Sequence, residues 1–330
     1  MDPLITEARR FGRLTVCIAT ITRCRPQMLA NLMQSWSRLA MPRDCDCFFL
    51  VVENHSRRKR TLPPVIRNGE IGDVRLVHAL ERQHGIPFAR NRAVEVALEH
   101  GADVLLFIDD DEIAEPDWLT TLVEAYRIGD ASLLGGPVVA KPPDGILSPW
   151  QKIVFDGLRA RFERVARRSA RALGAGRSVV IITSNWLADM HLFGEHGLRF
   201  DESLRLCGGS DVVLSKAVKA MGLSLQWVPG AVVHETLPVE RLTLLYQFRR
   251  ARDQSNASFR RCVARSKFCY LAPLASAPLR LLGAAMLLPV IPFAKGPALV
   301  SVARSAGWVV GRLSVFAGKK FSHYATTTGS

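Results

Sequence analysis

Apolar runs in the first half of the chain end repeatedly in short polar clusters. The runs have the β-rich composition of buried strands and cover residues 14–20, 47–52, 74–79 and 104–108, with helical patterns at 26–39 and 88–100. This alternation predicts an α/β fold, in which a mostly parallel sheet is flanked by helices. Ligand sites in such sheets lie beyond the carboxyl ends of the strands, so we expect the polar clusters to converge at one edge.

The most informative polar cluster is formed by Asp109, Asp110 and Asp111, directly after the strand predicted at 104–108. Three adjacent carboxylates repel one another, and a divalent cation such as Mn²⁺ or Mg²⁺ relieves that repulsion. We therefore expect Asp109 and Asp111 to be metal ligands, with Asp110 beside them. The alternative is the start of a helix over 117–126, since Pro116 suits a first helical turn and acids favour the positive end of the helix dipole.

The pattern changes after residue 137. Residues 158–177 include seven arginines and predict a basic, mobile segment near the site. The remaining elements expected are a strand at 179–182, a helix at 212–221 with Ser210 or Asp211 as its N-cap, a strand pair at 225–234 around Pro229 and Gly230, and a long basic helix at 239–267.

The chain from residue 241 onward is both basic and apolar. It carries 14 Lys and Arg against one acid, Asp253, and therefore +13 of the chain's net charge of +14. Its charge-free stretch, 281–294, is shorter than the roughly 18–20 residues that span a membrane, and prolines interrupt it. A longer window, 268–294, could span only if Arg280 were paired or reached the interface. We expect interfacial or re-entrant helices on an anionic membrane, because a nucleic-acid partner would not explain the apolar segments.

Length, cysteines and the N-terminus bear on organisation and compartment. The 330 residues accommodate an α/β domain over 1–240, with a donor half at about 14–140 and an acceptor half at 141–240, plus a membrane-associated tail at 241–330. Seven cysteines without a Cys-x-x-Cys pair argue against a disulfide framework or a zinc ribbon and favour a reducing compartment. Residues 1–13 are charged, unlike a secretory signal, so we expect the chain to begin in the cytosol.

A series of ordered motifs then gives a specific resemblance. The motifs are VCIATITRCRP at 16–26, VVENHS at 51–56, GIPFARN at 85–91, FIDDD at 107–111, FD at 200–201, GGSD at 208–211 and QFRR at 247–250. In this order they resemble the family 2 glycosyltransferases of the GT-A fold, and most of all the bacterial exopolysaccharide branch with the succinoglycan-type glucosyltransferases. The resemblance covers residues 14–265, and its specificity comes from the order of motifs that are weak singly.

The resemblance implies roles in binding a nucleotide sugar. Glu53 corresponds to the acidic residue that binds the uracil and ribose of a UDP-sugar, and a carboxylate can accept hydrogen bonds from both. Thr20 and Arg23 would flank the nucleotide. Arg90 and Asn91 match an Ala-Arg-Asn motif that orients the base and the metal-binding carboxylates.

It also implies roles in catalysis. Asp109 and Asp111 resemble the Asp-x-Asp pair that holds Mn²⁺ or Mg²⁺ against the donor diphosphate, and Asp109 and Asp110 would contact the nucleotide sugar. Asp211 resembles the base that takes a proton from the acceptor hydroxyl in inverting members, with Ser210 where a Glu often stands. A helix N-cap is the alternative role for Asp211, and Asp201 is the next candidate base.

The match at 247–252 is more distant. It resembles the Gln-x-x-Arg-Trp helix of processive members, but Ala251 replaces the Trp, so we do not expect a processive polymerase. Arg249 and Arg250 could bind a diphosphate through their guanidinium groups. They could equally belong to a basic, membrane-facing helix. His234 is expected to be a packed strand residue without a catalytic role.

These features predict an inverting, metal-dependent hexosyltransferase on the cytoplasmic face of the bacterial inner membrane, peripheral or monotopic. It would move one hexose from a UDP-sugar, UDP-glucose being one candidate, to a polyprenyl-diphosphate-linked saccharide in exopolysaccharide or other surface-glycan biosynthesis. No nucleic-acid partner is expected, and the sequence does not indicate an oligomeric state. A non-catalytic membrane- or nucleic-acid-binding protein with a degenerate nucleotide fold is the alternative, which intact Asp109, Asp111 and Asp211 argue against. A nucleotidyltransferase is disfavoured because the N-terminal region has no Gly-rich, Lys-containing phosphate loop.

Overall fold

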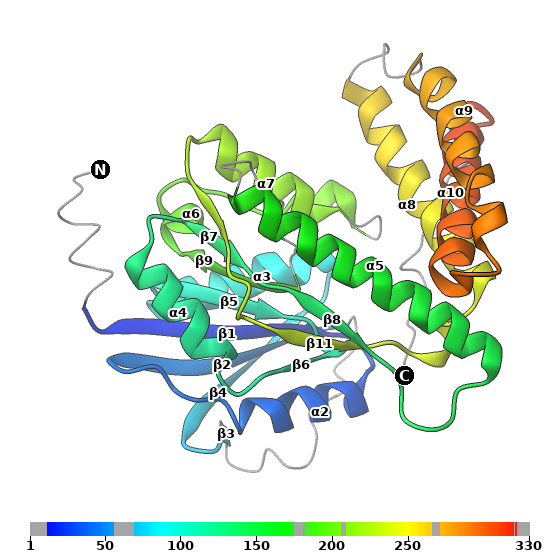
Figure 1. The fold of residues 1–330 in the computed structure, drawn as a ribbon. Helices are drawn as coiled ribbons and strands as arrows, with labels where there is room; N and C mark the ends of the chain where they lie inside the picture. The colour runs from blue at the N-terminus through cyan, green and yellow to red at the C-terminus, as the bar shows by residue number, and fades with distance from the viewer. Residues whose placement is uncertain are drawn as a thin grey trace.

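The computed structural model describes residues 12–55, 69–174, 181, 184–205, 209–265, 271–319 and 321. An eight-stranded sheet with the strand order β10-β7-β9-β5-β1-β2-β4-β3 forms its centre (Figure 1). The four neighbouring strands that run parallel are β5 (Val104–Ile108), β1 (Leu14–Thr22), β2 (Cys45–Asn54) and β4 (Val74–Glu81). The outer strands are β10 (Leu225–Trp227), β7 (Leu133–Gly135), the antiparallel β9 (Asn185–Asp189) and β3 (Glu70–Ile71).

A smaller sheet with the order β6-β11-β8 lies beside the end of β5. Its strands are β6 (Glu112–Ala114), β8 (Val138–Lys141) and β11 (Val233–Thr236). The strand pair predicted around Pro229 and Gly230 is wrong, because β10 pairs with β7 in the large sheet whereas β11 pairs with β6 and β8. The register of β11 against β6 sets Glu235 opposite Glu112 and so brings a distant carboxylate to the end of β5.

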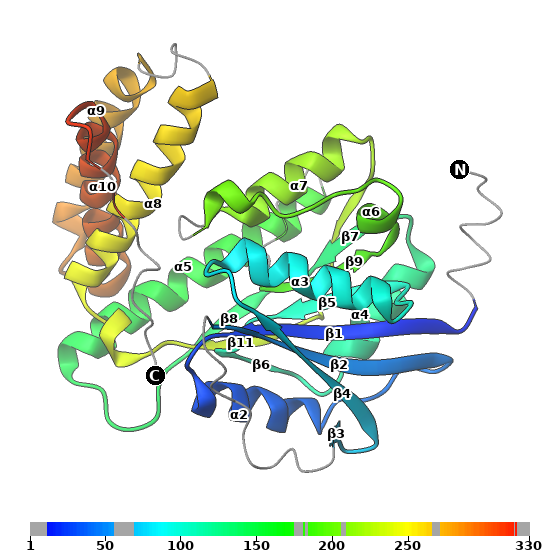
Figure 2. The same ribbon diagram turned by 180° about the vertical axis from the view of Figure 1, so that it is seen from behind.

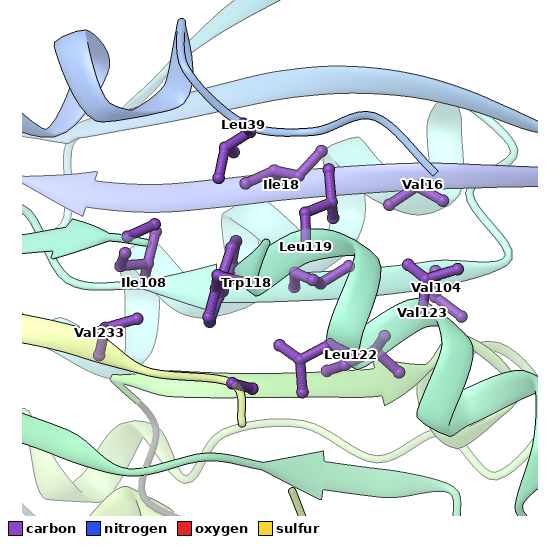
Figure 3. Close-up of a cluster of buried hydrophobic side chains, with 14 of the residues drawn as sticks. Val16, Ile18, Leu39, Val104, Ile108, Trp118, Leu119, Leu122, Val123 and Val233 are labelled. Carbon is purple, nitrogen blue, oxygen red and sulfur yellow. The ribbon is translucent and has the colours of Figure 1, made fainter. Parts of the chain in front are cut away.

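Helices cover both faces of the large sheet, as predicted for an α/β fold (Figures 1 and 2). One face packs against α2 (Pro26–Trp36) and α4 (Trp118–Ile128), and the other against α3 (Ile86–Glu99), α6 (His191–Gly194) and α7 (Ser210–Ala220). Alternate residues of one strand enter different cores, since Ile18 faces α2 and α4 while Ala19 faces α3. Burial on both faces explains the continuous apolar runs in the sequence. Figure 3 shows the first core, in which Trp118 lies against the strands.

The arginine-rich segment is a helix. α5 (Pro149–Gly174) runs through most of the region predicted to be mobile, so that prediction is wrong as far as Gly174. Val154, Phe155 and Leu158 are buried in a third apolar cluster. Because these residues are one helical turn apart or adjacent, they lie on one face of α5, and their burial stabilises the first turns of the helix. Arginine itself is a good helix former. Arg177 lies outside the described residues.

Two further local predictions are altered. The strand expected at 179–182 falls largely outside the described residues, and the strand that follows, β9, begins at Asn185. The N-cap of α7 is Gly209, not Ser210 or Asp211, and no side chain caps this helix end. Gly209 has φ 88°, a left-handed conformation that glycine adopts without strain.

The C-terminal part is a group of helices beside the first turns of α5 (Figure 1). It consists of α8 (Leu244–Arg265), α9 (Ala272–Ala285) and α10 (Lys295–Phe316), with the short 3-10 helices η2 (Val239–Arg241) and η4 (Leu288–Val290) in the connections. The long basic helix predicted at 239–267 therefore begins after η2, at Leu244.

Glycines bring α10 into backbone contact with its neighbours. A Cβ on Gly307 would overlap the carbonyl oxygen of Phe248 in α8, and a Cβ on Gly311 would overlap that of Arg252. Gly296 meets Gly157 of α5 in the same way. Such small residues let helix backbones touch. The C-terminal helices are therefore joined to the α/β domain by close packing.

The apolar surface of the protein concentrates on these helices. α10 is the one helix among the described residues that is long and apolar enough to cross a membrane by length and composition. The window 268–294 is not a single helix, since α9 ends at Ala285. Large apolar side chains are exposed here at Leu271, Leu279, Leu281, Leu282, Met286, Leu288, Val290, Phe293, Val310, Leu313 and Phe316. We call this set the apolar tail surface.

The cysteines differ in part from expectation. Cys17, Cys24, Cys45 and Cys47 are free, but Cys262 is disulfide-bonded to a partner outside the described residues. A disulfide at Cys262 is unexpected for the reducing compartment that the cysteine pattern favours. One such bond does not amount to a disulfide framework.

Candidate active site

The predicted polar clusters do meet at one edge of the sheet. Thr22 at the end of β1 lies in register with Glu53 of β2, and β5 ends immediately before Asp109. Since β1 is the neighbour of both β2 and β5 and runs parallel to them, all three carboxyl ends open on the same side. This is where open α/β sheets bind ligands.

Asp110 is held by the end of β1. Thr22 Oγ1 donates to its Oδ2 at 2.8 Å, and Arg25 Nη1 donates to its Oδ1 at 2.7 Å. Its side chain is buried. Because both carboxylate oxygens are engaged, Asp110 fixes the loop after β5 against the segment after β1.

Asp111 is held from the opposite direction. Arg241 Nη2 donates to Asp111 Oδ2 at 3.0 Å, and the Nη1 of the same guanidinium donates to Glu235 Oε1 at 2.9 Å. Arg25 approaches Asp111 more loosely, at 3.4 Å. A single arginine from η2 thus joins β11 to the loop after β5.

Asp109 is the most open carboxylate of the three, with 34% of its side chain exposed. Among the described residues it forms a salt bridge with Arg90 Nη2 at 3.4 Å, and its backbone N–H donates to Glu112 Oε2. Burial of the carboxylate and the charges of Asp111 and Asp110 raise the pKa of Asp109 to about 7, against the opposing effect of Arg90. Burial also raises the pKa of Glu112 well above its ordinary value.

The charges around this loop do not balance. The carboxylates are Asp109, Asp110, Asp111, Glu112 and Glu235, and the arginines that form salt bridges with them are Arg25, Arg90 and Arg241. Within the described residues, no group of three or more His, Cys, Asp or Glu is placed to hold a metal alone. The donors fit instead a site in which one or two carboxylates share Mg²⁺ or Mn²⁺ with substrate phosphates. A divalent ion would also favour the charged form of Asp109, whose pKa is raised by burial and then by the charges of Asp111 and Asp110.

The alternative role of the three aspartates as a helix start is wrong. β6 follows them directly, and α4 begins only at Trp118 with Asp117 as its N-cap. The aspartates therefore lie in a loop between two strands.

Arg90 links this loop to the start of α7. Its Nη1 donates to Ser210 Oγ at 2.9 Å while Nη2 faces Asp109, and the residue is buried between the rings of Phe107 and Phe200. Ser210 thus has a defined contact in the site. Asp211 is the next residue of α7, so its backbone lies beside this contact.

Other candidate residues have local partners. Asn91 uses both ends of its amide on the backbone of Phe200, so it holds the 200–202 segment in place. Asp201 accepts hydrogen bonds from the backbone and hydroxyl of Ser203 at the start of η1 (Glu202–Leu204). His234 Nε2 lies 2.7 Å from Glu115 Oε1.

The nucleotide candidates lie where β1 and β2 end. Glu53 is buried, with His78 Nε2 3.5 Å from its Oε2. Thr20 Oγ1 is buried and has no hydrogen-bond partner among the described residues. Arg23 is half-buried after β1.

The two arginines of α8 occupy different environments. Arg249 is exposed, whereas Arg250 is half-buried and lies close enough to Glu235 to lower the pKa of that carboxyl against the larger effect of burial. Gln247 is buried and donates to the carbonyl of Arg241 at 2.8 Å. The structure therefore connects Arg250, but not the exposed Arg249, to the carboxylate loop.

Sequence reasoning missed Arg25, Glu112, Glu235 and Arg241. Arg25 stands in the first motif beside Pro26, and Glu112 directly follows the three aspartates, so proximity to known motifs was an available signal. Glu235 and Arg241 come from a distant segment, and only the pairing of β11 with β6 brings them here.

Comparisons with known proteins decide the family. Residues 15–197, more than half of the chain, match the family described as Glycosyl transferase family 2. The chain belongs to this family. Among curated relatives, the succinoglycan biosynthesis protein ExoM of Rhizobium meliloti is 27% identical over 248 residues, which are 72% of each chain. The glucosyl-dolichyl phosphate glucuronosyltransferase of Haloferax volcanii is 42% identical over 72 residues, 22% of each chain.

Solved structures show that this family 2 glycosyltransferase has the GT-A fold. The mannosyltransferase PcManGT from Pyrobaculum calidifontis, in complex with GDP-Man and Mn²⁺, has a TM-score of 0.61 at 17% identity and covers 96% of this chain and 95% of its own. GalNAc-T7 with UDP, GalNAc and Mn²⁺ has a TM-score of 0.50 at 15% identity, covering 75% of this chain and 51% of its own. The predicted fold class and family are confirmed.

Proposed function

We propose that this enzyme is an inverting, divalent-metal-dependent hexosyltransferase that moves one sugar from a UDP-sugar to a lipid-linked saccharide. The observation that carries the proposal is the partly exposed carboxylate of Asp109, next to buried Asp111 and on the same sheet edge as Glu53. The presence of Mn²⁺ and nucleotide sugars or UDP in complexes of proteins with this fold supports it.

Donor binding is assigned to the ends of β1, β2 and β5. Glu53 accepts hydrogen bonds from the uracil N–H and a ribose hydroxyl, while the unpartnered hydroxyl of Thr20 and the cation of Arg23 flank the nucleotide. Asp109 and Asp111 would hold Mn²⁺ or Mg²⁺ together with the donor phosphates. When bound, this ion supplies Lewis-acid stabilisation of the negative charge that develops on UDP.

Arg90 and Asp211 are assigned to the acceptor side of the reaction. Arg90 fixes Asp109 relative to Ser210, which sets the start of α7 with respect to the donor. Asp211 then removes the proton of the acceptor hydroxyl as this oxygen attacks the anomeric carbon from the face opposite UDP. Because the bond to the acceptor oxygen forms on that face as the bond to UDP breaks, the configuration of the anomeric carbon is inverted.

The acceptor and the location rest on the C-terminal helices. We assign residues 1–240 to the catalytic domain and 241–330 to a unit that lies on the cytoplasmic face of the bacterial inner membrane. The apolar tail surface would enter the interface, and the +13 charge of this unit would attract anionic lipids. The close contact of Gly296 with Gly157 favours a peripheral or monotopic arrangement, because it ties α10 to the catalytic domain. The relatives named for succinoglycan biosynthesis and dolichyl phosphate support a polyprenyl-diphosphate-linked acceptor.

The test is donor turnover by the full chain in detergent micelles. We expect one UDP-hexose to be hydrolysed slowly with Mn²⁺, with activity lost in excess chelator and regained on adding metal. Full activity in chelator would contradict the metal assignment, and turnover of GDP-mannose without any UDP-sugar would contradict the nucleotide assignment. Failure of every nucleotide sugar to bind or react would favour the non-catalytic alternative.

A further inference from the structure

Four arginines from different helices meet where the catalytic domain joins the C-terminal helices. They are Arg161 of α5, Arg250 of α8, Arg280 of α9 and Arg304 of α10, and we call them the junction arginines. The donor-binding roles proposed above use none of these four arginines, although Arg250 also lies near Glu235. The cluster therefore begins at the edge of the active site and extends toward the tail.

Helix packing places Arg161 and Arg304 together. Gly296 of α10 contacts Ile153 and Gly157, while a Cβ on Gly157 would also meet Val300, so the first turns of α10 pack against the first turns of α5. Arg161 lies one turn after Gly157 and Arg304 one turn after Val300, and the two are close enough for the charge of Arg161 to lower the pKa of Arg304.

Direct contacts add the other two arginines. Arg304 Nη1 donates to Gln247 Oε1 at 3.0 Å, and Arg250 lies three residues after Gln247 on the same side of α8. The guanidinium carbon of Arg280 lies 4.6 Å from the ring centroid of Trp308, one turn after Arg304 in α10.

The four arginines carry more positive charge than the neighbouring carboxylate of Glu235 can offset. None of the junction arginines forms a salt bridge with a described residue, and the Nε of Arg250 is buried without a hydrogen-bond partner. Burial and the charges of Arg161, Arg250 and Arg280 lower the pKa of Arg304 to about 9. Burial and neighbouring arginines lower the pKa of Arg161 as well. Bringing cations together in this way is unfavourable, and a bound anion would offset the cost.

We infer that the junction arginines bind the diphosphate of the lipid-linked acceptor, a specificity that rests on the proposed transferase function. Arginine binds phosphate oxygens through paired N–H groups, and a diphosphate offers enough oxygens for several arginines. Arg280 stands on α9 between exposed Leu279 and Leu281, which belong to the apolar tail surface. An acceptor lipid lying along that surface thus brings its diphosphate to the cluster. Arg250 lies on the side of the cluster nearest Glu235, so the saccharide would extend from there toward the carboxylate loop.

The test measures binding of farnesyl diphosphate to the full chain in detergent micelles, with UDP and Mn²⁺ present at saturation to fill the donor site. We expect Arg161→Gln and Arg304→Gln each to weaken binding at least tenfold. The matched control is Arg167→Gln, which removes one exposed charge from the same helix α5 and should change binding less than twofold. Melting temperatures monitor folding, and Arg304→Gln should not lower them because it removes a desolvated cation.

Three results would overturn the inference. Unchanged farnesyl diphosphate affinity in both variants would remove the junction arginines from the site, and Arg161→Gln alone decides this if Arg304→Gln does not fold. Displacement of farnesyl diphosphate by UDP with Mn²⁺ would assign the arginines to the donor. If both variants bound phosphatidylglycerol vesicles tenfold more weakly than the unsubstituted protein but kept its farnesyl diphosphate affinity, the cluster would be a phospholipid headgroup site. UDP binding by the unsubstituted protein is measured separately. If UDP does not bind, the proposed transferase function is refuted; if UDP binds but the variants bind farnesyl diphosphate normally, only the present inference fails.

Discussion

Arg241 donates one hydrogen bond to Asp111, at 3.0 Å, and through its other terminal nitrogen joins the same carboxylate to β11. Both partners are nearly inaccessible to water, with 10% and 8% of their side chains exposed. This pair therefore connects the loop that carries the metal candidates to the segment that leads into the C-terminal helices. Its contribution differs from that of a surface ion pair, because removal of one partner leaves a buried charge behind.

Arg241→Met should accordingly destabilise the protein by about 3 kcal/mol, near the lower end of the usual cost of breaking a buried ion pair, because Asp111 keeps its looser contact with Arg25. Urea unfolding in chelator measures this. Mn²⁺ should recover part of the loss, since it supplies the missing positive charge. The control is Arg13→Gln, which breaks the exposed pair with Asp46 and should have little effect. Equal effects of the two substitutions would contradict a structural role for Arg241.

Asp109 and Asp110 should respond in opposite ways to conversion into amides. Asp110→Asn weakens the contacts with Thr22 and Arg25, so it should lower the melting temperature while leaving the rise caused by Mn²⁺ and UDP largely intact. Asp109→Asn removes a repelled carboxylate, so the metal-free protein should melt at a higher temperature and show little response to Mn²⁺. Differential scanning fluorimetry with and without Mn²⁺ separates the two. A full Mn²⁺ response in Asp109→Asn would exclude this residue as a ligand.

The pKa of about 7 for Asp109 predicts a pH dependence. Because the folded-state pKa lies above the ordinary value of 3.8, the native protein retains a proton that the unfolded chain releases, and stability falls as pH rises between about 4 and 7. Metal binding needs the deprotonated carboxylate, so stabilisation by Mn²⁺ should be larger at pH 8 than at pH 6. Unfolding curves at both pH values test this, and Asp109→Asn should flatten the dependence. A Mn²⁺ effect that does not vary with pH would argue that protons and metal do not compete at Asp109.

Asp211→Asn should reduce transfer at least about 10²-fold with little change in UDP affinity, because loss of a general base acts on the transition state and not on donor binding. Single-turnover transfer and UDP titration measure the two quantities. Asp201→Asn is the comparison, and its local hydrogen bonds to Ser203 predict a smaller effect on transfer. If Asp211→Asn retained normal turnover while Asp201→Asn lost it, the base would be Asp201.

The exposed residues of α9 should govern membrane association. Leu279, Leu282 and Met286 lie on one side of the helix and are each more than half exposed. Changing all three to Ser should reduce sedimentation with anionic vesicles severalfold at any salt concentration, since salt screens only the attraction between charges. Ile128→Ser, at an exposed position on α4, is the control and should leave sedimentation unchanged. Complete release of the unsubstituted protein by high salt would instead show a purely electrostatic contact.

The strands and the acidic loop were predictable because their signals are local. The apolar run 104–108 followed by three aspartates predicts a buried strand and a polar loop, and β5 follows this pattern. That residues 149–174 form a packed helix was not predictable in this way. The many arginines of this segment suggested exposure to solvent, and only the tertiary contact with α10 shows that the helix is packed. Glu235 and Arg241 belong to the same class, because a strand register determines their proximity to Asp111.

The contact between Gly157 and Gly296 has a consequence for acceptor length. No side chain separates the two backbones there, so α5 and α10 are packed closely at this point and have little freedom to move apart. From this contact α5 continues across the catalytic domain. The whole helix has 26 residues and is therefore about 39 Å long. In the proposed membrane-bound state, this contact fixes the distance between the active site and the lipid headgroups. The enzyme would then select acceptors by length, because only a glycan whose terminal sugar lies at that distance from the membrane reaches the active site.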